Sequence, residues 1–346
     1  MYISNTLISW YSNNKRDLPW RKTKDPYQIW LSEVILQQTR VEQGLPYFLH
    51  FQSKYPTVRD LALASEDEVM RSWQGLGYYS RARNLHAAAK QVHTEFAGEF
   101  PKSYLELLQL RGVGEYTAAA IASFSYKEVT PVLDGNVFRF LSRYYGIHTP
   151  INSSSAKKEY TAVAKELIDP NRPDTFNQAI MEFGALQCKP KSPDCSTCPL
   201  NGTCMAFKNN EVDLLPIKDK KGKRSTRFFY YFLFQHNNTT ALKKRIAKDI
   251  WQSLYEFPMF ESKTELEELE ILSMATDLKL LTENSKIEHI SPKIKHVLSH
   301  QDIYARFFKI YDPHFQHQNR GKYLYIKDDK LMEFAFPRLI EQYLQK

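Results

Sequence analysis

A cluster of cysteines is the feature that most constrains this chain. The sequence contains four cysteines, and all lie within seventeen positions in the spacing C-x6-C-x2-C-x5-C, at Cys188, Cys195, Cys198 and Cys204. Together they can surround one metal centre, either a tetrahedral zinc ion or a [4Fe–4S] cluster, because both require soft thiolate ligands. Structural zinc sites more often use two C-x2-C pairs, and only Cys195 and Cys198 form one here, so spacing alone barely separates the two.

The length and composition indicate two domains. A chain of 346 residues with 42% hydrophobic and 14% aromatic residues can build two cores. Its net charge of +8 is compatible with a polyanionic partner. Residues 1–10 mix polar and apolar side chains and no stretch approaches eighteen apolar residues, so we expect neither a signal peptide nor a membrane span. A cytoplasmic location follows, where reducing conditions favour thiols as metal ligands over disulfides.

Apolar spacing divides the chain into three parts. Residues 1–206 carry apolar residues at helical spacing between short polar breaks, which predicts an all-α domain. Residues 217–227, IKDKKGKRSTR, are strongly basic and predict a solvated linker that could also touch a polyanion. The aromatic and β-branched runs that follow predict strands, and therefore an α+β domain. The predicted bounds are 1–216, 217–227 and 228–346.

Glu33 is the first candidate catalytic carboxyl group. Asp25 and Pro26 are typical of a helix start, because Asp accepts hydrogen bonds from free amides and Pro lacks the unused N–H. Glu33 follows on that helix among largely apolar neighbours. Burial there would disfavour the anion and raise the pKa, as a proton donor near neutral pH requires. A surface or ion-paired glutamate is the alternative.

A glycine turn between two helices is a candidate anion site. Gly112, Val113 and Gly114 separate an apolar helix from one that opens near Tyr116 and Thr117. The glycines let the backbone approach a phosphate, and the turn amides with the second helix N-terminus attract anions. This pattern resembles a helix-hairpin-helix, which supports duplex binding without sequence preference; an ordinary corner between helices is the alternative.

Asp134 is the second candidate carboxyl group. The run VLDGNV also fits a β-hairpin, but the helically spaced residues that follow and end at Gly146 favour a helix N-cap at Asp134. Amide hydrogen bonds and the helix dipole would then hold Asp134 ionised, with a lower pKa than Glu33. Two carboxyl groups with separated pKa values form the pattern that cleaves glycosidic bonds. Capping alone is the alternative.

Six motifs in this order resemble the adenine DNA glycosylase (MutY) family. They are LPWR at 18–21, SEVILQQT at 32–39, GLGYYSRAR at 75–83, RGVGEYTAAAI at 111–121, VLDGNV at 132–137 and the cysteine run. The resemblance implies a helix-hairpin-helix glycosylase fold with one [4Fe–4S] cluster in the loop 188–204, followed by a Nudix-like domain. It implies a monomeric base excision repair enzyme that removes adenine mispaired with 8-oxoguanine or guanine in double-stranded DNA.

The resemblance also implies roles for individual residues. Glu33 would protonate the departing adenine, Asp134 would stabilise the sugar cation or bond to it, and Tyr116 and Asn136 would orient this site. The adenine pocket would include Leu18, Trp20, Arg21, Gln178 and Met181. DNA contacts, among them side chains that fill the base stack, would include Gln38, Thr39, Leu76, Tyr78, Gly112, Val113 and Gly114. Ser299 and His300 would read the base opposite adenine.

Three further features of the sequence refine these expectations. Endonuclease III-like enzymes place a nucleophilic lysine where this chain has Tyr116, so a monofunctional glycosylase is expected. The second domain lacks the glutamate-rich Nudix hydrolase signature and should not cleave nucleotide diphosphates. The family's Phe-Ser-His triplet is Leu298, Ser299 and His300 here, so the aromatic contact is lost.

Three other functions fit part of the sequence. An endonuclease III-type glycosylase is disfavoured by Tyr116, Glu33 and the second domain. A noncatalytic iron–sulfur protein that binds DNA or senses redox state is disfavoured by Glu33 and Asp134, since a binder needs no carboxylates near phosphates. A zinc-containing transcription regulator differs in colour, because only an iron–sulfur protein absorbs near ~400 nm.

Overall fold

The computed structural model describes residues 2–219, 222, 224–319 and 321–345, which form two compact units. The first contains residues 1–63 and 84–221, and the second contains 64–83 and 222–346. The sequence predicted one continuous boundary near residue 217, whereas residues 64–83 pack with the C-terminal half. Positions 220, 221 and 223 of the predicted linker lie outside the described residues.

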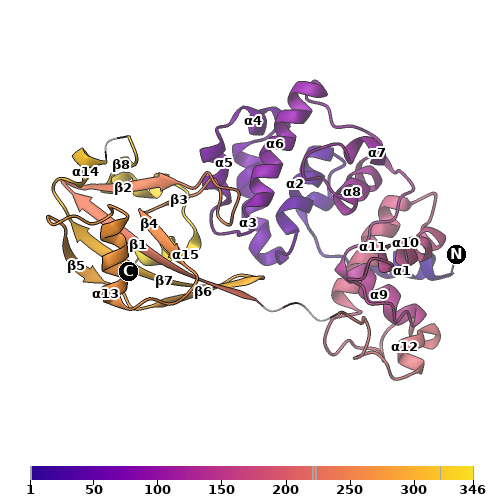
Figure 1. The fold of residues 1–346 in the computed structure, drawn as a ribbon. Helices are drawn as coiled ribbons and strands as arrows, with labels where there is room; N and C mark the ends of the chain where they lie inside the picture. Colours follow the sequence, from indigo (N-terminus) through magenta and orange to yellow (C-terminus); the bar gives the residue numbers. More distant parts are fainter. Residues whose placement is uncertain (1, 220–221, 223, 320, 346) are drawn as a thin grey trace. The chain divides into compact units, whose positions relative to one another are not determined.

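The first unit is helical, and no strand occurs among its described residues (Figure 1). Helix α6, Ser80–Glu95, begins in the second unit and continues into the first. The other helices of the first unit are α1 Tyr2–Asn14, α2 Pro26–Leu36, α3 Val41–Lys54, α4 Val58–Leu63, α7 Tyr104–Leu107, α8 Glu115–Tyr126, α9 Gly135–Tyr145, α10 Ala156–Leu167, α11 Pro173–Leu186 and α12 Met205–Lys208, with 3-10 turns at Pro19–Arg21 and Asn201–Thr203. Among the described residues, no helix is long and apolar enough to cross a membrane.

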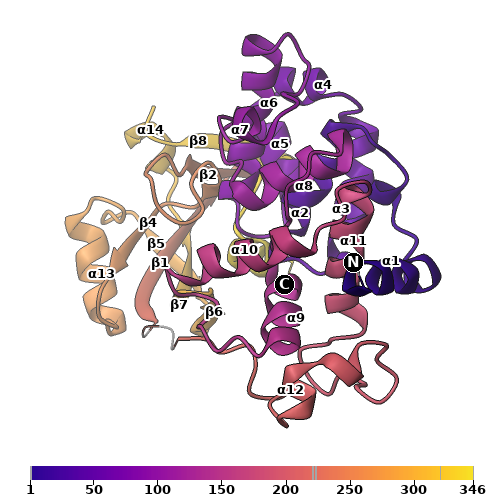
Figure 2. The ribbon, with the colours of Figure 1, turned by 90° about the vertical axis from the view of Figure 1, so that its right-hand side faces the viewer.

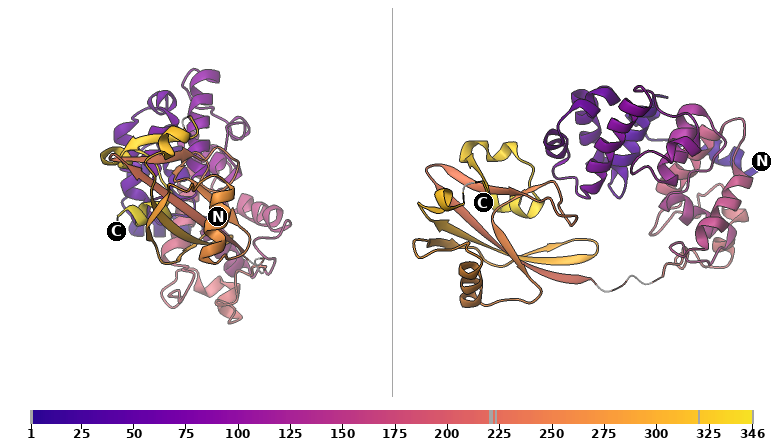
Figure 3. Two further views of the ribbon diagram at one scale, coloured as in Figure 1. Left: turned by 60° about the vertical axis from the view of Figure 1, so that its left-hand side comes forward. Right: turned by 45° about the horizontal axis from the view of Figure 1, so that its top comes forward.

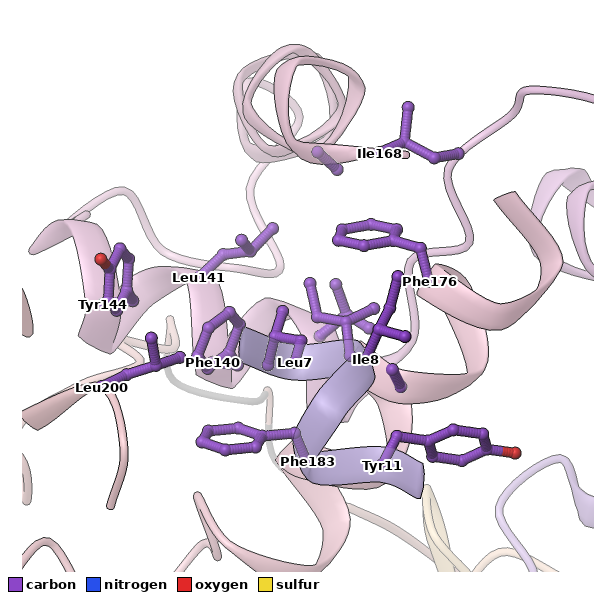
Figure 4. Packing of buried hydrophobic residues seen from close by; sticks show 14 of the residues in the cluster. Leu7, Ile8, Tyr11, Phe140, Leu141, Tyr144, Ile168, Phe176, Phe183 and Leu200 are labelled. Atoms are coloured by element: carbon purple, nitrogen blue, oxygen red, sulfur yellow. The ribbon is translucent and has the colours of Figure 1, made fainter. Parts of the chain in front are cut away.

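A buried cluster joins α1, α9, α10 and α11 (Figure 4). Leu7 of α1 and Leu141 of α9 are fully buried, and Phe183 of α11 packs edge-on against Phe140 with their ring centroids 5.3 Å apart. Helices α9 and α11 approach closely at Gly184, where an added Cβ would lie 2.7 Å from the Asn136 carbonyl oxygen. Because these four helices pack together, residues that are distant in the sequence lie close to one another in the first unit.

Local signals explain where the helices of the site begin and end. The Asp25 side chain accepts a hydrogen bond from the Tyr27 amide, with Pro26 in the first helical position of α2. The Asp134 side chain caps α9, which ends at Gly146 in the left-handed conformation. The predicted N-caps at Asp25 and Asp134 are therefore confirmed, and the β-hairpin alternative for VLDGNV is excluded.

The second unit is built around a mixed sheet with strand order β3-β2-β1-β7-β5, with β4, β6 and β8 as additional strands. Strands β1 and β7 run parallel and the other pairs run antiparallel. The strands are β1 Ser225–His236, β2 Thr239–Lys244, β3 Tyr255–Glu256, β4 Met259–Ser262, β5 Lys286–Ile290, β6 Ile294–Val297, β7 Gln301–Tyr311 and β8 Leu324–Lys327.

Aromatic residues form the core of the second unit. Phe232 of β1 stacks on Phe308 of β7 at 5.2 Å, and Ile271 and Ala275 of α13, Glu268–Asp277, belong to the same cluster. Figures 2 and 3 show the sheet and α13 from further directions. The other helices are α14 Phe315–Gln318, the 3-10 turn Asp328–Glu333 and α15 Arg338–Leu344.

Segment 64–83 is attached to this sheet by polar contacts. It contains α5, Glu66–Trp73. Asp67 of α5 accepts a hydrogen bond from the Tyr255 hydroxyl at 2.9 Å and pairs with Lys244 at 2.6 Å. Gln74 donates to Glu341 at 2.9 Å. No local pattern in the sequence indicates these long-range contacts. The domain bounds predicted from the sequence therefore did not group residues 64–83 with the sheet.

Candidate active site

A pocket of about 820 Å³, part of it open to solvent, lies in the first unit and is within the size range of small-molecule sites. It gathers all nine residues assigned from the sequence to the catalytic and base-binding groups, together with Thr39. These are Leu18, Trp20, Arg21, Glu33, Thr39, Tyr116, Asp134, Asn136, Gln178 and Met181. They come from α2, α8, α9, α11 and the segments beside them.

Glu33 is buried in the pocket wall. Its exposed fraction is 8%, and the Tyr116 hydroxyl donates to its Oε2 at 2.5 Å. Burial raises the pKa of Glu33 to about 7, opposed by the Tyr116 hydrogen bond and reinforced by the negative charge of Asp134. The predicted rise is therefore confirmed, and Glu33 holds a transferable proton near neutral pH.

Asp134 is held by hydrogen bonds from three N–H groups. Its Oδ1 accepts from the amides of Asn136 at 2.9 Å and Val137 at 2.8 Å, and its Oδ2 accepts from Asn136 Nδ2 at 2.6 Å. Burial nevertheless raises the pKa of Asp134 above its ordinary value, although these bonds and Arg139 lower it. The cap that the sequence predicted is therefore present, but burial, which the sequence did not indicate, shifts the pKa of Asp134 upward; whether it lies below that of Glu33 stays a prediction.

Asn136 belongs to a hydrogen-bond chain that continues to the cysteine loop. Arg139 Nη2 donates to Asn136 Oδ1 at 2.8 Å and to the Gly184 carbonyl oxygen at 2.5 Å. The Nε of Arg139 donates to the Cys188 carbonyl oxygen at 2.8 Å. Arg139 is 8% exposed and was not predicted as a site residue. It lies three residues, about one turn, after Asn136 on α9, and this spacing is the sequence signal for its position.

A buried ion-pair network forms another part of the wall. Glu182 is 1% exposed, and Arg16 and Arg21 each bind both of its carboxylate oxygens at 2.6 to 2.9 Å. Burial alone would raise the pKa of Glu182, but the two guanidinium groups lower it to about 2. Sequence reasoning missed Arg16 and Glu182. Helical spacing could have found Glu182, four residues after Gln178 on the same face of α11.

The four cysteine thiols line one separate cavity together with Phe140, Phe183 and Leu200. Burial, and to a lesser degree the neighbouring thiols, raises the pKa of Cys198 to about 11. A positive metal centre would therefore be needed to hold the Cys198 sulfur as a thiolate. Among the described residues, no group of three or more Cys, His, Asp or Glu side chains forms a ready-made site for a metal ion. Arg143 Nη1 lies 3.5 Å from Cys188 Sγ.

The predicted glycine turn is present between α7 and α8. Gly112 has φ +70°, and an added Cβ would lie 2.4 Å from Asn84 Cβ. Both the left-handed backbone conformation and the contact with Asn84 therefore exclude a side chain at this position. Gly114 is the N-cap of α8 without a side-chain acceptor, so the first amides of that helix are left for another partner. Val113 is buried beneath the turn. Gln38, beside the pocket residue Thr39, has φ +53°.

The remaining predicted residues belong to the second unit. Leu76 is 5% exposed, whereas Tyr78 is 46% exposed with φ +46°. Ser299 and His300 are exposed at the tip of the β6–β7 hairpin, closed by the Leu298 amide donating to the Gln301 carbonyl oxygen at 2.9 Å. Ser299 Oγ and His300 Nδ1 are 3.2 Å apart.

Comparisons with known proteins point in one direction. Residues 31–169 match the HhH-GPD superfamily of base excision DNA repair proteins, and residues 229–346 match the NUDIX domain. The chain is 36% identical over 301 residues to the adenine DNA glycosylase of Buchnera aphidicola subsp. Schizaphis graminum, covering 86% of this chain and 85% of that protein. It is 44% identical over 219 residues to the human adenine DNA glycosylase, covering 61% and 40%.

Solved structures agree on the fold of the helical part. A thermostable thymine-DNA glycosylase matches with a TM-score of 0.56 and 27% identity, over 60% of this chain and 96% of that one. A trapped endonuclease III–DNA covalent intermediate matches with a TM-score of 0.53 and 22% identity, over 60% and 95%. The second of these supports the fold alone.

Proposed function

The chain belongs to the adenine DNA glycosylase family, and from this we propose that it removes adenine mispaired with 8-oxoguanine, or with guanine, from double-stranded DNA. It is a glycosylase that hydrolyses N-glycosyl bonds, with a helical helix-hairpin-helix domain followed by a Nudix-like domain. The mispair and the residue roles below are parts of the proposal.

Glu33 acts as the general acid. Adenine leaves with difficulty as an anion, and protonation of its N7 makes it a neutral leaving group. A carboxyl group with a pKa of about 7 carries that proton at neutral pH, and the Tyr116 hydroxyl occupies Oε2, which leaves Oε1 to donate. The ionised Glu33 then takes a proton from the attacking water.

Asp134 stabilises the positive sugar that remains. In its ionised form it faces an oxocarbenium-like transition state, either as a charge partner or through a transient bond to the sugar carbon. Asn136 and the helix amides hold both oxygens in place, which lowers the cost of orienting the charge during the reaction. Tyr116 stands where a Schiff-base lysine would be needed, so no strong strand-nicking activity accompanies base removal.

The pocket accepts a base that has been extruded from the duplex. Leu18, Trp20 and Met181 supply apolar contact, while Arg21 and Gln178 supply polar groups. The backbone of Gly112, Val113 and Gly114 binds a phosphate, and Leu76 and Tyr78 belong to the loop that fills the stack. Gln38 and Thr39 contact the DNA beside the pocket.

The cysteine cavity holds one [4Fe–4S] cluster, with Cys188, Cys195, Cys198 and Cys204 as its ligands. Support comes from the four thiols that line one cavity. The cluster supplies structural support to the loop, whose Lys189 and Lys191 then bind the DNA backbone. We further propose that the enzyme works as a cytoplasmic monomer.

One observation carries this proposal: Glu33, with a pKa of about 7, and Asp134 share one pocket of the first unit. The test is adenine release under single-turnover conditions from duplexes with 8-oxoguanine, guanine or thymine opposite adenine. We expect release from the first two and little from the third. Equal release from all three would reject the mispair specificity, and absence of release would reject the function.

A further inference from the structure

The loop that carries Leu76 and Tyr78 turns sharply between α5 and α6. Its backbone is in the left-handed conformation at Gly75 with φ +91°, at Gly77 with φ +77° and at Tyr78 with φ +46°. Glycine adopts this conformation freely, but a tyrosine does so at a cost in free energy, and such strain persists only where surrounding contacts hold it. Contacts around the loop must therefore hold Tyr78 in place.

Two buried side chains bind the carbonyl oxygen of Gly77. The indole Nε1 of Trp73 donates to it at 3.0 Å, and Arg81 Nη2 donates to it at 3.2 Å. Both side chains are buried and belong to the segment 64–83 of the second unit, so packing fixes the positions of the two donors. Because this carbonyl group belongs to the peptide that precedes Tyr78, the two hydrogen bonds fix the backbone beside the exposed ring.

Arg81 also contacts the ring of Tyr78. Its guanidinium carbon lies 5.6 Å from the centre of the Tyr78 ring and 5.1 Å from the centre of the Trp73 ring. The cation–π attraction is strongest where the cation is removed from water, as it is at Arg81. Burial lowers the pKa of Arg81 only to about 10, so the guanidinium stays charged at neutral pH. One buried cation therefore contacts both the backbone and the ring of the exposed Tyr78.

We propose that Arg81 is a positioning residue that holds Tyr78 ready for insertion into the base stack. This inference rests on the proposed function, in which Tyr78 belongs to the loop that fills the stack. A side chain that is ordered before binding loses less conformational entropy on insertion, so more of its contact energy helps to keep the base outside the duplex. Arg81 acts through Tyr78, because its own exposed fraction of 8% leaves little surface for a DNA phosphate.

The experiment measures single-turnover release of adenine opposite 8-oxoguanine, in wild-type protein and in Tyr78→Ala protein. Arg81→Met removes the charge and the donors, and in wild type it should lower the rate about threefold to thirtyfold, as loss of one cation–π contact implies. In Tyr78→Ala protein, which should itself be slower than wild type, the same change should alter the rate by less than about twofold. Arg81→Lys keeps the charge and a donor, so it should retain part of the rate. Lys90→Met, an exposed change further along α6, is the charge control and should alter neither rate.

A merely structural role for Arg81 would make Arg81→Met lower the rate by the same factor with and without the Tyr78 ring, and this result would overturn the inference. A direct phosphate contact would also overturn it. In that case Arg81→Met would reduce the slope of log affinity against log salt concentration by about one unit, whereas positioning of Tyr78 leaves the slope unchanged.

Three further outcomes would reject the inference: a wild-type rate for Arg81→Met, a wild-type rate for Tyr78→Ala, or an Arg81→Lys protein no faster than Arg81→Met. If Arg81→Met does not fold, Arg81→Gln takes its place, because it keeps an N–H donor for the Gly77 carbonyl oxygen but carries no charge. If wild-type protein releases adenine, failure of these results concerns Arg81 alone, whereas no adenine release rejects the proposed function as well.

Discussion

The hydroxyl of Tyr116, at the start of α8, donates a hydrogen bond to Glu33 Oε2 on α2 across 2.5 Å. This bond lowers the pKa of a carboxyl group that burial raises to about 7. One oxygen of Glu33 is thereby oriented, and the proton is directed to the other. The orientation and the pKa of Glu33, the acid of the proposed reaction, therefore depend on Tyr116, a residue more than eighty positions away in the sequence.

Replacement of Glu33 by Gln should abolish base release and leave mismatch binding largely intact. The amide keeps the shape of the carboxyl group but cannot transfer the proton, and general acid catalysis contributes about 10²–10⁴-fold. Single-turnover adenine release and DNA binding measured on the same preparation check this. Glu166→Gln, an exposed change on α10, is the control. Release within about tenfold of wild type would show that Glu33 is not the acid.

The rate of base release should depend on the protonation of Glu33. The acid form of Glu33 is required, so the single-turnover rate constant should fall about tenfold per pH unit above about pH 7. It should also fall at low pH, where Asp134, whose pKa burial raises, becomes protonated. Tyr116→Phe removes a hydrogen bond that lowers the pKa of Glu33, so the fall should begin at higher pH even though the rate itself decreases. A profile that does not shift, or shifts to lower pH, would contradict this role of Tyr116.

Ionisation of Glu33 should lower the free energy of unfolding at alkaline pH. The folded-state pKa of Glu33 is raised from 4.5 to about 7, so the stabilising proton is fully present below about pH 4.5 and lost as pH rises through 7. At pH 8 the ionised group costs at most about 3 kcal/mol. Glu33→Gln should therefore raise Tm relative to wild type at pH 8 more than at pH 5. An equal difference at both values would mean that the pKa of Glu33 is not raised in the folded protein.

Cys198→Ser should reduce iron content, folded yield and DNA affinity together. Metal binding and folding of the loop are coupled, and loss of one thiolate weakens both. Iron analysis, absorbance near ~400 nm and duplex binding measure the three effects. Ser196→Ala, in the same loop, should alter none of them. A Cys198→Ser protein with full iron content and unchanged binding would refute the assignment.

The double change Ser299→Ala with His300→Ala should narrow the preference for 8-oxoguanine over guanine opposite adenine. Both side chains are exposed at a hairpin tip and offer hydrogen bonds to the added carbonyl oxygen and protonated N7 of the oxidised base. Each lost bond costs about 0.5–1.5 kcal/mol, so discrimination should fall several-fold to tenfold. Release of adenine opposite 8-oxoguanine should continue. The exposed change His317→Ala is the control, and a folded double variant that keeps its full preference would assign both residues to packing.

Local chemistry explains what the sequence predicted by itself. Asp25 with Pro26, and Asp134 followed by a run that ends at Gly146, specify helix ends through contacts within a few residues. The apolar neighbours of Glu33 on its own helix indicated that this side chain could be buried. The strand breaks around Ser299 and His300 were likewise readable, because alternation of side chains along a strand is a local property.

Tertiary structure decided what depends on distant parts of the chain. Asp134 has a raised pKa because helices from elsewhere in the first unit bury it, although its own helix start favours the anion. Glu182 with Arg16, and Gln178 with Tyr11, meet only when α1 packs on α11. The sequence determined the elements and the chemical groups, because these follow from near neighbours. Packing determined pKa values, partners and the attachment of residues 64–83, because burial and long-range hydrogen bonds have no local signature.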